Sequence, residues 1–274
     1  MQLLQLLTEQ ADRQQEVVEL INLIKQAKPF FDQRGSDANA WLYRGVKRSE
    51  VPQTLAAATS PRQDRRPADT APQLHARLDN RLEQEFGIKY RSTSTFVTSD
   101  RGFASDYGQV CVILPLGQFK YVYAKNTRDA YNRFRARQAK KYIMDRAEAK
   151  NLDLSGMPSY GPSMSDAGAR TQEADLMNWF DSQPELKPLI DEWFEATYQS
   201  CQYTSPQSIM EGLLSGNEIM LHCDHIAVIP VVAHVHPDTI SLIERALNAK
   251  FDLGMEAYPS TSELINLMLP YIFK

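Results

Sequence analysis

The chain contains 274 residues, of which 43% are hydrophobic and 23% charged, values that are typical of a soluble globular protein and exclude a disordered tail or a fibrous repeat. Its 30 basic and 34 acidic side chains leave a net charge of -4, which argues against general nucleic-acid binding. The N-terminus lacks the pattern of a secretory signal, and no apolar run approaches the roughly 20 residues that cross a bilayer, so we expect a cytoplasmic protein with no membrane partner. Three scattered cysteines are too few for a disulfide framework and are interpreted as buried thiols of a reducing compartment: Cys111, Cys201 and Cys223.

The chain begins with a predicted amphipathic helix over residues 9–28, in which apolar residues recur at helical spacing until a proline ends the run. An apolar strand over residues 41–43 follows and leads directly into an Arg-Gly pair. After a long polar loop, a second helix is predicted over residues 72–86, because apolar residues recur every four positions and a glycine follows. We expect the apolar face of this helix to pack on a sheet.

From residue 90 onward the pattern changes to that of β-strands. Alternating or continuous apolar residues predict strands over residues 91–98, 110–116, 119–123 and 218–232. A helical turn is expected between the first two strands, through Phe103 and Tyr107, and a turn near residues 223–225 divides the last stretch. Two amphipathic helices are predicted to follow, over residues 238–247 and 262–269.

Residues 127–206 differ from their surroundings, since they are rich in helical patterns that glycine and proline interrupt. At the start of this predicted insertion, residues 125–150 hold nine basic and three acidic side chains, whereas residues 173–195 hold seven acidic side chains and one lysine. We expect the two blocks to pack against each other through their aromatic and aliphatic residues. The charge match would set the register more than the stability, because exposed ion pairs contribute only about 0–1 kcal/mol each.

Three short motifs lie on the predicted strands: Tyr43-Arg44-Gly45, Ser92-Thr93-Ser94 and Gly216-Asn217-Glu218-Ile219-Met220-Leu221. Taken singly, the arginine is explained as a surface cation, the Ser-Thr-Ser run as the start of a strand, and the glutamate as a solvated charge at the edge of a sheet. Taken together, an arginine strand, a Ser-Thr-Ser strand and a glutamate strand in this order resemble the arginine-serine-glutamate clade of the mono-ADP-ribosyltransferases. The resemblance extends to the turns and strands between the motifs, and it covers residues 38–126 and 207–232. The combined pattern is also similar to proteins that tailed bacteriophages encode.

The resemblance implies an α+β fold with a split β-sandwich core, in which two small sheets face each other across an NAD cleft. A single domain would span residues 1–274. Its core would consist of residues 38–126 and 207–232, and residues 127–206 would form a helical insertion. The N-terminal helix and the C-terminal helices would decorate this core.

The resemblance also implies the chemistry of the site. Cleavage of the bond between nicotinamide and ribose in NAD, the co-substrate, passes through an oxocarbenium-like sugar, and a nearby carboxylate stabilises charge that appears only in the transition state. Glu218 would be this carboxylate, and the hydroxyl of Ser92 would help to orient it. Arg44 would hold the NAD phosphates, a task suited to a permanently charged planar fork.

Further residues near the motifs would complete the NAD site, and they are Gly45, Thr93, Ser94, Phe96, Phe103 and Tyr107. An aromatic ring is expected to stack on the nicotinamide, and Phe96 or Phe103 could provide it. Burial in the hydrophobic core explains either ring equally well, and it is the simpler explanation for Tyr107.

One departure from the family pattern concerns the acceptor of ADP-ribose. Members that modify arginine or asparagine commonly carry a glutamate or glutamine two residues before the catalytic glutamate, where this chain has Gly216. We expect a macromolecular acceptor, most simply a host protein, with nucleic acid less favoured. Two alternatives remain open, an NAD glycohydrolase and an inactive, virion-associated binding protein on the same fold.

Other polar clusters have simpler explanations. Two histidines that flank Asp224 lack a suitable fourth ligand, so we predict no metal site. Arg62, Arg65 and Arg66 lie in the polar loop before the second helix and could contact phosphates or a partner. A solvated loop is the interpretation that we favour for these arginines.

Overall fold

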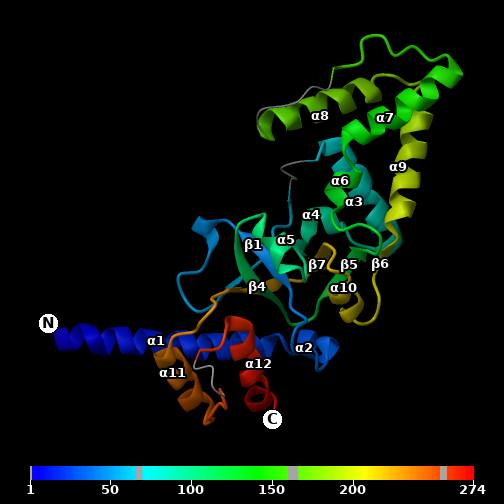
Figure 1. Ribbon diagram of the computed structural model, residues 1–274. Coiled ribbons are helices and arrows are strands. Elements are labelled where there is room, and N and C mark those ends of the chain that lie inside the picture. The colour runs from blue at the N-terminus through cyan, green and yellow to red at the C-terminus, as the bar shows by residue number, and fades with distance from the viewer. Residues whose placement is uncertain (1, 66–69, 160–165, 254–257) are drawn as a thin grey trace.

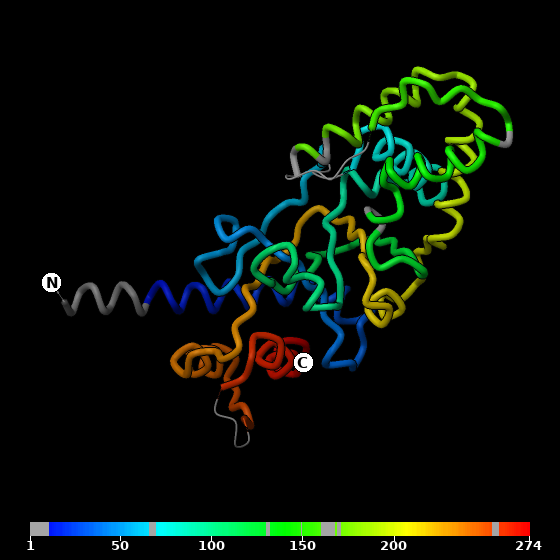
Figure 2. Tube along the Cα trace, turned by 45° about the horizontal axis from the view of Figure 1, so that its top comes forward, coloured from blue at the N-terminus to red at the C-terminus, as the bar shows by residue number. Residues whose placement is uncertain are grey.

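The computed structural model describes residues 2–65, 70–159, 166–253 and 258–274. The strands form two antiparallel four-stranded sheets. Figure 1 shows these sheets in the middle of the molecule, with the helices of the two chain ends on one side and the helices between residues 136 and 201 on the other. Figure 2 shows the same three-part arrangement from another direction. The fold is therefore mixed α/β, and the predicted combination of helices with two small sheets is confirmed.

The first sheet has the strand order β1-β4-β8-β2. Its strands are β1 (Tyr43–Val46), β4 (Gln109–Leu116), β8 (His225–Pro230) and β2 (Ala57–Thr59). Antiparallel pairing places Arg44 opposite Cys111 and Ile113 opposite Val228. The predicted strand over residues 110–116 is confirmed as β4, a central strand in which residues 111–116 are buried. Strand β2 lies in the loop that was predicted to be irregular.

The second sheet has the strand order β3-β7-β5-β6. Its strands are β3 (Thr95–Val97), β7 (Ile219–His222), β5 (Lys120–Ala124) and β6 (Tyr203–Thr204). A bridge joins the two sheets, because Tyr43 and Thr98 exchange backbone hydrogen bonds of 2.6 and 2.9 Å. The predicted stretch 218–232 divides at its turn, as expected, and its two strands belong to different sheets.

Short elements surround the junction of the sheets. They are η1 (Arg48–Glu50), α3 (Pro72–Phe86), α5 (Arg101–Ser105) and α10 (Met210–Ser215). Helix α3 has the predicted bounds, and Gly87 ends it in the left-handed conformation with a φ of 77°. Helix α5 confirms the predicted turn and is capped by Asp100, whose carboxylate accepts the N–H of Phe103 at 2.9 Å.

The strand predicted over residues 91–98 is wrong in its first half. Residues Tyr90–Thr93 form the short helix α4, and the strand begins only at Thr95. The backbone N–H of Arg91 donates to the carboxylate of Asp79, on α3, at 2.8 Å. This buried acceptor takes the place of a strand partner, so a tertiary contact overrides the local β propensity.

The two chain ends form one group of helices, made of α1 (Gln2–Gln26), α2 (Lys28–Arg34), α11 (Pro237–Leu247) and α12 (Thr261–Ile272). Helix α1 packs against α11, α12 and β4, and so covers the first sheet (Figure 1). Pro29, the predicted end of the first helix, instead lies in the first turn of α2, where its missing N–H is not needed. Both predicted C-terminal helices are confirmed, and Ser260 with Glu263 forms a capping box at the start of α12.

The central segment is helical, as predicted, and consists of α6 (Ala130–Arg133), α7 (Ala136–Ala147), η2 (Glu148–Lys150), α8 (Asp166–Asp181) and α9 (Lys187–Cys201). Helix α7 of the basic block packs against α8 and α9 of the acidic block, and Arg146 lies 3.7 Å from Glu192. The acidic block also pairs with α3, where Arg77 lies 2.7 Å from Asp191. The predicted packing of the two blocks is confirmed. Strand β6 lies within the predicted insertion 127–206, so the end of that segment belongs to the second sheet.

Candidate active site

A cavity of about 320 Å³ opens where the two sheets meet. Arg44 and Gly45 reach it from β1 of the first sheet, and Glu218 reaches it from the turn before β7 of the second. Three predicted aromatic residues also line it, namely Phe96, Phe103 and Tyr107. The fold therefore brings six of the nine predicted site residues to one cavity, and the three that it leaves out are Ser92, Thr93 and Ser94.

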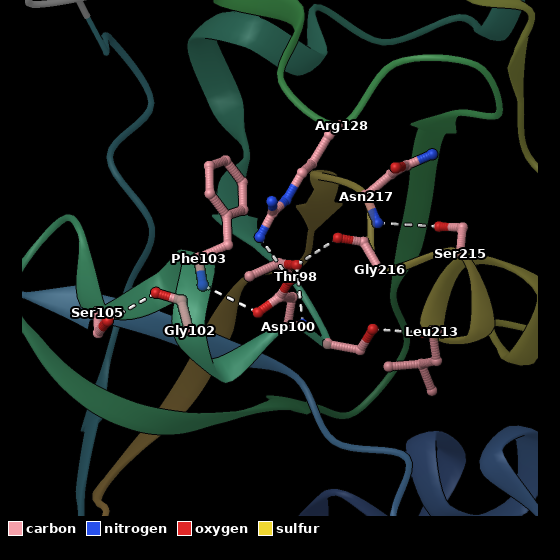
Figure 3. A network of polar contacts seen from close by, with 11 residues as sticks. Thr98, Asp100, Gly102, Phe103, Ser105, Arg128, Leu213, Ser215, Gly216 and Asn217 are labelled. Carbon is pink, nitrogen blue, oxygen red and sulfur yellow. Dashed lines mark hydrogen bonds and ion pairs between the residues drawn. The ribbon is translucent and has the colours of Figure 1, made fainter.

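The turn that carries Glu218 is held by three sets of hydrogen bonds, of which Figure 3 shows the one between Thr98 and Gly216. Gly216 ends α10 with a φ of 68°, which suits glycine, and its carbonyl accepts the hydroxyl of Thr98 at 3.0 Å. The side-chain amide of Asn217 donates to two carbonyls at the end of β5, at 2.7 and 3.0 Å. The backbone N–H of Glu218 donates to the carbonyl of Arg128 at 2.9 Å. Segments far apart in the sequence thus fix the point from which the Glu218 side chain enters the cavity.

The carboxylate of Glu218 is largely buried, with 16% of its side chain exposed. Its Oε1 atom lies 3.6 Å from Nη1 of Arg91, whose side chain is 5% exposed. Burial raises the pKa of Glu218. The positive charges of Arg91 and Arg65 oppose this rise, and the negative charge of Asp129 adds to it. In this poorly hydrated position the carboxylate interacts more strongly with positive charge on a bound molecule than it would in water.

Ser92 does not contact Glu218 and faces α3. Its hydroxyl donates to the carboxylate of Asp79, and Nε2 of His75 lies 3.1 Å from the same hydroxyl oxygen. The residue of this segment that approaches Glu218 is Arg91, which the sequence patterns did not single out. An arginine beside a polar run carries no signal that would distinguish it from a surface cation.

The neighbouring Thr93 and Ser94 also lie outside the cavity lining. The hydroxyl of Thr93 donates to the carbonyl of Lys89 at 3.0 Å, within the same helical turn. The hydroxyl of Ser94 is buried and has no hydrogen-bond partner among the described residues. These placements follow from α4, because a helix rotates successive side chains by about 100° instead of alternating them across a sheet.

Arg65 lines the cavity from the loop before α3. Its guanidinium carbon lies 3.6 Å from the centre of the Phe96 ring, and that of Arg91 lies 4.8 Å from the same centre. The interpretation of a solvated loop is therefore wrong for Arg65, although it holds for the exposed Arg62. The third arginine of the loop, Arg66, lies outside the described residues.

Positive charge is concentrated in this part of the cavity. Burial lowers the pKa of Arg65 to about 10, and the neighbouring Arg44 and Arg91 add to the effect. Burial also lowers the pKa of Arg44, against the attraction of Glu50. The pKa of His75 is lowered to about 4, by burial first and Arg91 second, so its ring is neutral at pH 7. Arginine side chains carry a positive charge at that pH, so the wall of the cavity that Arg44, Arg65 and Arg91 form attracts anions.

A second aromatic group lines the cavity on and after α5. Phe103 and Tyr107 pack edge to face with ring centres 5.5 Å apart, and the guanidinium of Arg128 lies 4.7 Å from the centre of Phe103 (Figure 3). Tyr107 is 57% exposed, so burial in the core is the wrong explanation for this residue. Gly45 allows α5 to approach β1, because a Cβ atom there would lie 2.2 Å from the carbonyl oxygen of Ala104.

All three cysteines are buried free thiols. Among the described residues, no group of three or more His, Cys, Asp or Glu side chains could hold a metal ion. None of the helices in the part of the chain that the structure describes has the length and apolar character that crossing a membrane requires.

Comparison of the chain with protein-family models, curated proteins and solved structures finds no match. The residues of the site are therefore the evidence for its chemistry: cations, a largely buried carboxylate and aromatic rings line one cavity.

Proposed function

We propose that this protein is a mono-ADP-ribosyltransferase that cleaves NAD and transfers ADP-ribose to a macromolecular acceptor. The observation that carries the proposal is the meeting of Arg44, from one sheet, with Glu218, from the edge of the other, in a single cavity. The two motif residues are distant in the sequence, and strand pairing brings them together. Under this proposal the two four-stranded sheets correspond to the split β-sandwich of that family.

Glu218 stabilises the charge that develops on the sugar. When the bond between ribose C1′ and the nicotinamide nitrogen breaks, both bonding electrons leave with nicotinamide and the ribose becomes oxocarbenium-like. A buried carboxylate that is fixed before the reaction stabilises this cation without reorganising. The acceptor nucleophile then forms the new bond to C1′, and its proton passes to solvent.

Arg44 binds the diphosphate of NAD, and Phe103 with its neighbour Tyr107 offers an aromatic surface for nicotinamide. Phe96 is less suited to stacking, because the guanidinium of Arg65 already covers its ring at 3.6 Å. Arg91 contacts Glu218 at 3.6 Å in place of the expected serine.

The acceptor in this proposal is a protein of a bacterial host, and the reaction takes place in the host cytoplasm, where the three free thiols stay reduced. One observation favours a second candidate, an NAD glycohydrolase. Gly216, at the position from which related enzymes act on the acceptor, has no side chain, and its carbonyl is already bound by Thr98. Water could then take the place of a macromolecular acceptor.

The test incubates the purified protein with labelled NAD and a bacterial lysate, and follows both labelled macromolecules and released nicotinamide. Glu218→Ala is the decisive variant, and Glu211→Ala, at an exposed glutamate of α10, is its matched control. Label that depends on Glu218 supports the transferase, and nicotinamide without labelled product supports the glycohydrolase. Turnover by Glu218→Ala at the wild-type rate would contradict both. If the wild type forms neither product, the inactive binding protein replaces the proposal.

A further inference from the structure

Arg91 is buried and Arg65 is half-buried, and together they form a cluster of positive charge to which the proposed reaction assigns no ligand. Arg65 lies in the loop before α3, and its backbone N–H donates to the carbonyl of Ser92 at 3.0 Å, which ties this loop to α4. Arg91 belongs to α4 itself. Their guanidinium carbons lie 3.6 and 4.8 Å from the centre of the Phe96 ring, on β3, and both side chains line the cavity. A loop, a helix and a strand thus converge to hold two guanidinium groups at one ring.

These two guanidinium groups carry buried N–H groups that lack an acceptor. Nη1 of Arg65 and Nε of Arg91 have no hydrogen-bond partner in the part of the chain that the structure describes. The ion pair of Arg91 with Glu218 is 3.6 Å long, whereas a charge-assisted hydrogen bond measures about 2.7–2.9 Å. Buried N–H groups are almost always paired in folded proteins, so unpaired ones in a cavity wall call for an acceptor from outside the chain.

The charges around the cluster favour an anion. Four cations of the described cavity lining, Arg44, Lys47, Arg65 and Arg91, face three carboxylates, Glu50, Asp129 and Glu218. His75, which also lines the cavity, adds no charge at pH 7, because its pKa is lowered to about 4. The repulsion that Arg65 experiences from Arg44 and Arg91 would be relieved by a negative group between them.

We propose that Arg65 and Arg91 form a binding subsite for a phosphate or diphosphate group. Such groups suit two guanidinium forks better than a single carboxylate does, because their oxygens can accept from several directions at once. The Phe96 ring holds both guanidinium groups by cation–π contact and leaves their N–H groups to the ligand. The phosphate group belongs either to a nucleotide or to a free inorganic anion. The subsite lies in the cavity of the proposed reaction, but its binding of a phosphate group requires no turnover.

Isothermal titration calorimetry of the full chain with inorganic pyrophosphate and, separately, with ADP-ribose tests this subsite. We expect both ligands to bind the wild type, and Arg65→Gln and Arg91→Gln each to weaken binding by at least about tenfold. Arg62→Gln, at an exposed arginine of the same loop, is the matched control and should bind like the wild type. Thermal melting shows whether each variant is folded. If a glutamine variant is not, Arg65→Lys keeps the charge but loses the fork, and it should weaken binding too.

The outcomes separate the two sources of the phosphate group. Tighter binding of ADP-ribose than of pyrophosphate assigns the group to a nucleotide, and equal binding assigns it to a free anion. No binding to the wild type, or unchanged affinity in either folded glutamine variant, overturns the subsite. Glu218→Ala retains both arginines and should bind pyrophosphate at least as tightly as the wild type, even if it releases no nicotinamide. A failure of the subsite is therefore distinguishable from a failure of the proposed function.

Discussion

The hydroxyl of Ser92 donates a hydrogen bond to the carboxylate of Asp79 on α3. The same carboxylate accepts the backbone N–H of Arg91 at 2.8 Å. Because the Ser92 proton is directed toward Asp79, the serine oxygen accepts the Nε2–H of His75, which lies 3.1 Å away. This largely buried network fastens α4 to α3 and sets the position of Arg91 in the cavity.

The network predicts a loss of stability in mild acid. The pKa of His75 is lowered from 6.5 to about 4, by burial first and by Arg91 second. The unfolded chain therefore binds the proton first, and the free energy of unfolding decreases as the pH falls from 6.5 toward 4. Urea unfolding should show a loss of about 2 kcal/mol from this group between pH 7 and pH 5. His75→Gln should remove this part of the pH dependence, whereas His225→Gln, at an exposed ring, should retain it. An unchanged dependence in His75→Gln would show that another group is responsible.

Glu218→Gln should separate activity from stability. We expect the rate of nicotinamide release to fall by about 10²–10³, since the variant loses charge that stabilises the transition state. The pKa of Glu218 is raised, chiefly by burial, so the folded state holds this proton above the ordinary pKa of 4.5 and loses stability as the pH rises through the raised value. Glutamine remains neutral, and the variant should melt at pH 7 no lower than the wild type. Glu211→Gln serves as the control for both measurements. A large fall in melting temperature for Glu218→Gln alone would mean that the charged carboxylate stabilises the folded state, contrary to this expectation.

Gly45→Ala should destabilise the junction of β1 with α5. An added Cβ would lie 2.2 Å from the carbonyl oxygen of Ala104 and 2.8 Å from the backbone nitrogen of Gly108, and backbone atoms cannot swing aside as a flexible side chain can. Overpacking of this kind costs about 1–3 kcal/mol, to be measured by urea unfolding. Gly102→Ala, within α5, is the matched control, because its Cβ would come no closer than 3.2 Å to its nearest neighbour, the side chain of Asp100. Equal stability of the two variants would disprove the close approach.

Asn217→Ala should lower kcat more than it changes KM. The Asn217 side chain donates two hydrogen bonds, of 2.7 and 3.0 Å, that hold the turn immediately before Glu218. Their loss should cost about 1–2 kcal/mol of stability and loosen the position of the Glu218 carboxylate. Steady-state kinetics of nicotinamide release measure the split between kcat and KM. Asn126→Ala, whose amide makes one 3.5 Å contact, is the control. A rise in KM alone would mean that Asn217 acts on binding and not on the position of Glu218.

The sequence by itself determined the elements whose apolar residues the core buries. Helix α3 has the predicted bounds, and β4 and α11 agree with their predictions within one residue. In α3 and α11 the apolar residues recur at helical spacing, in β4 they form a continuous run, and the core buries most of them. The local sequence pattern and the tertiary packing then favour the same secondary structure, so the pattern alone predicts the element.

The tertiary structure decided which polar side chains meet. The order of the motifs singled out Arg44 and Glu218, but their common cavity depends on strand pairing across two sheets. Whether Ser92 faces the cavity depends on Asp79, and whether Arg65 is solvated depends on Phe96. Hydrophobic periodicity is a property of neighbouring residues and is visible along the chain. Hydrogen bonds and ion pairs act over a few ångströms between residues that are distant in the sequence, so their partners are chosen only when the fold brings them together.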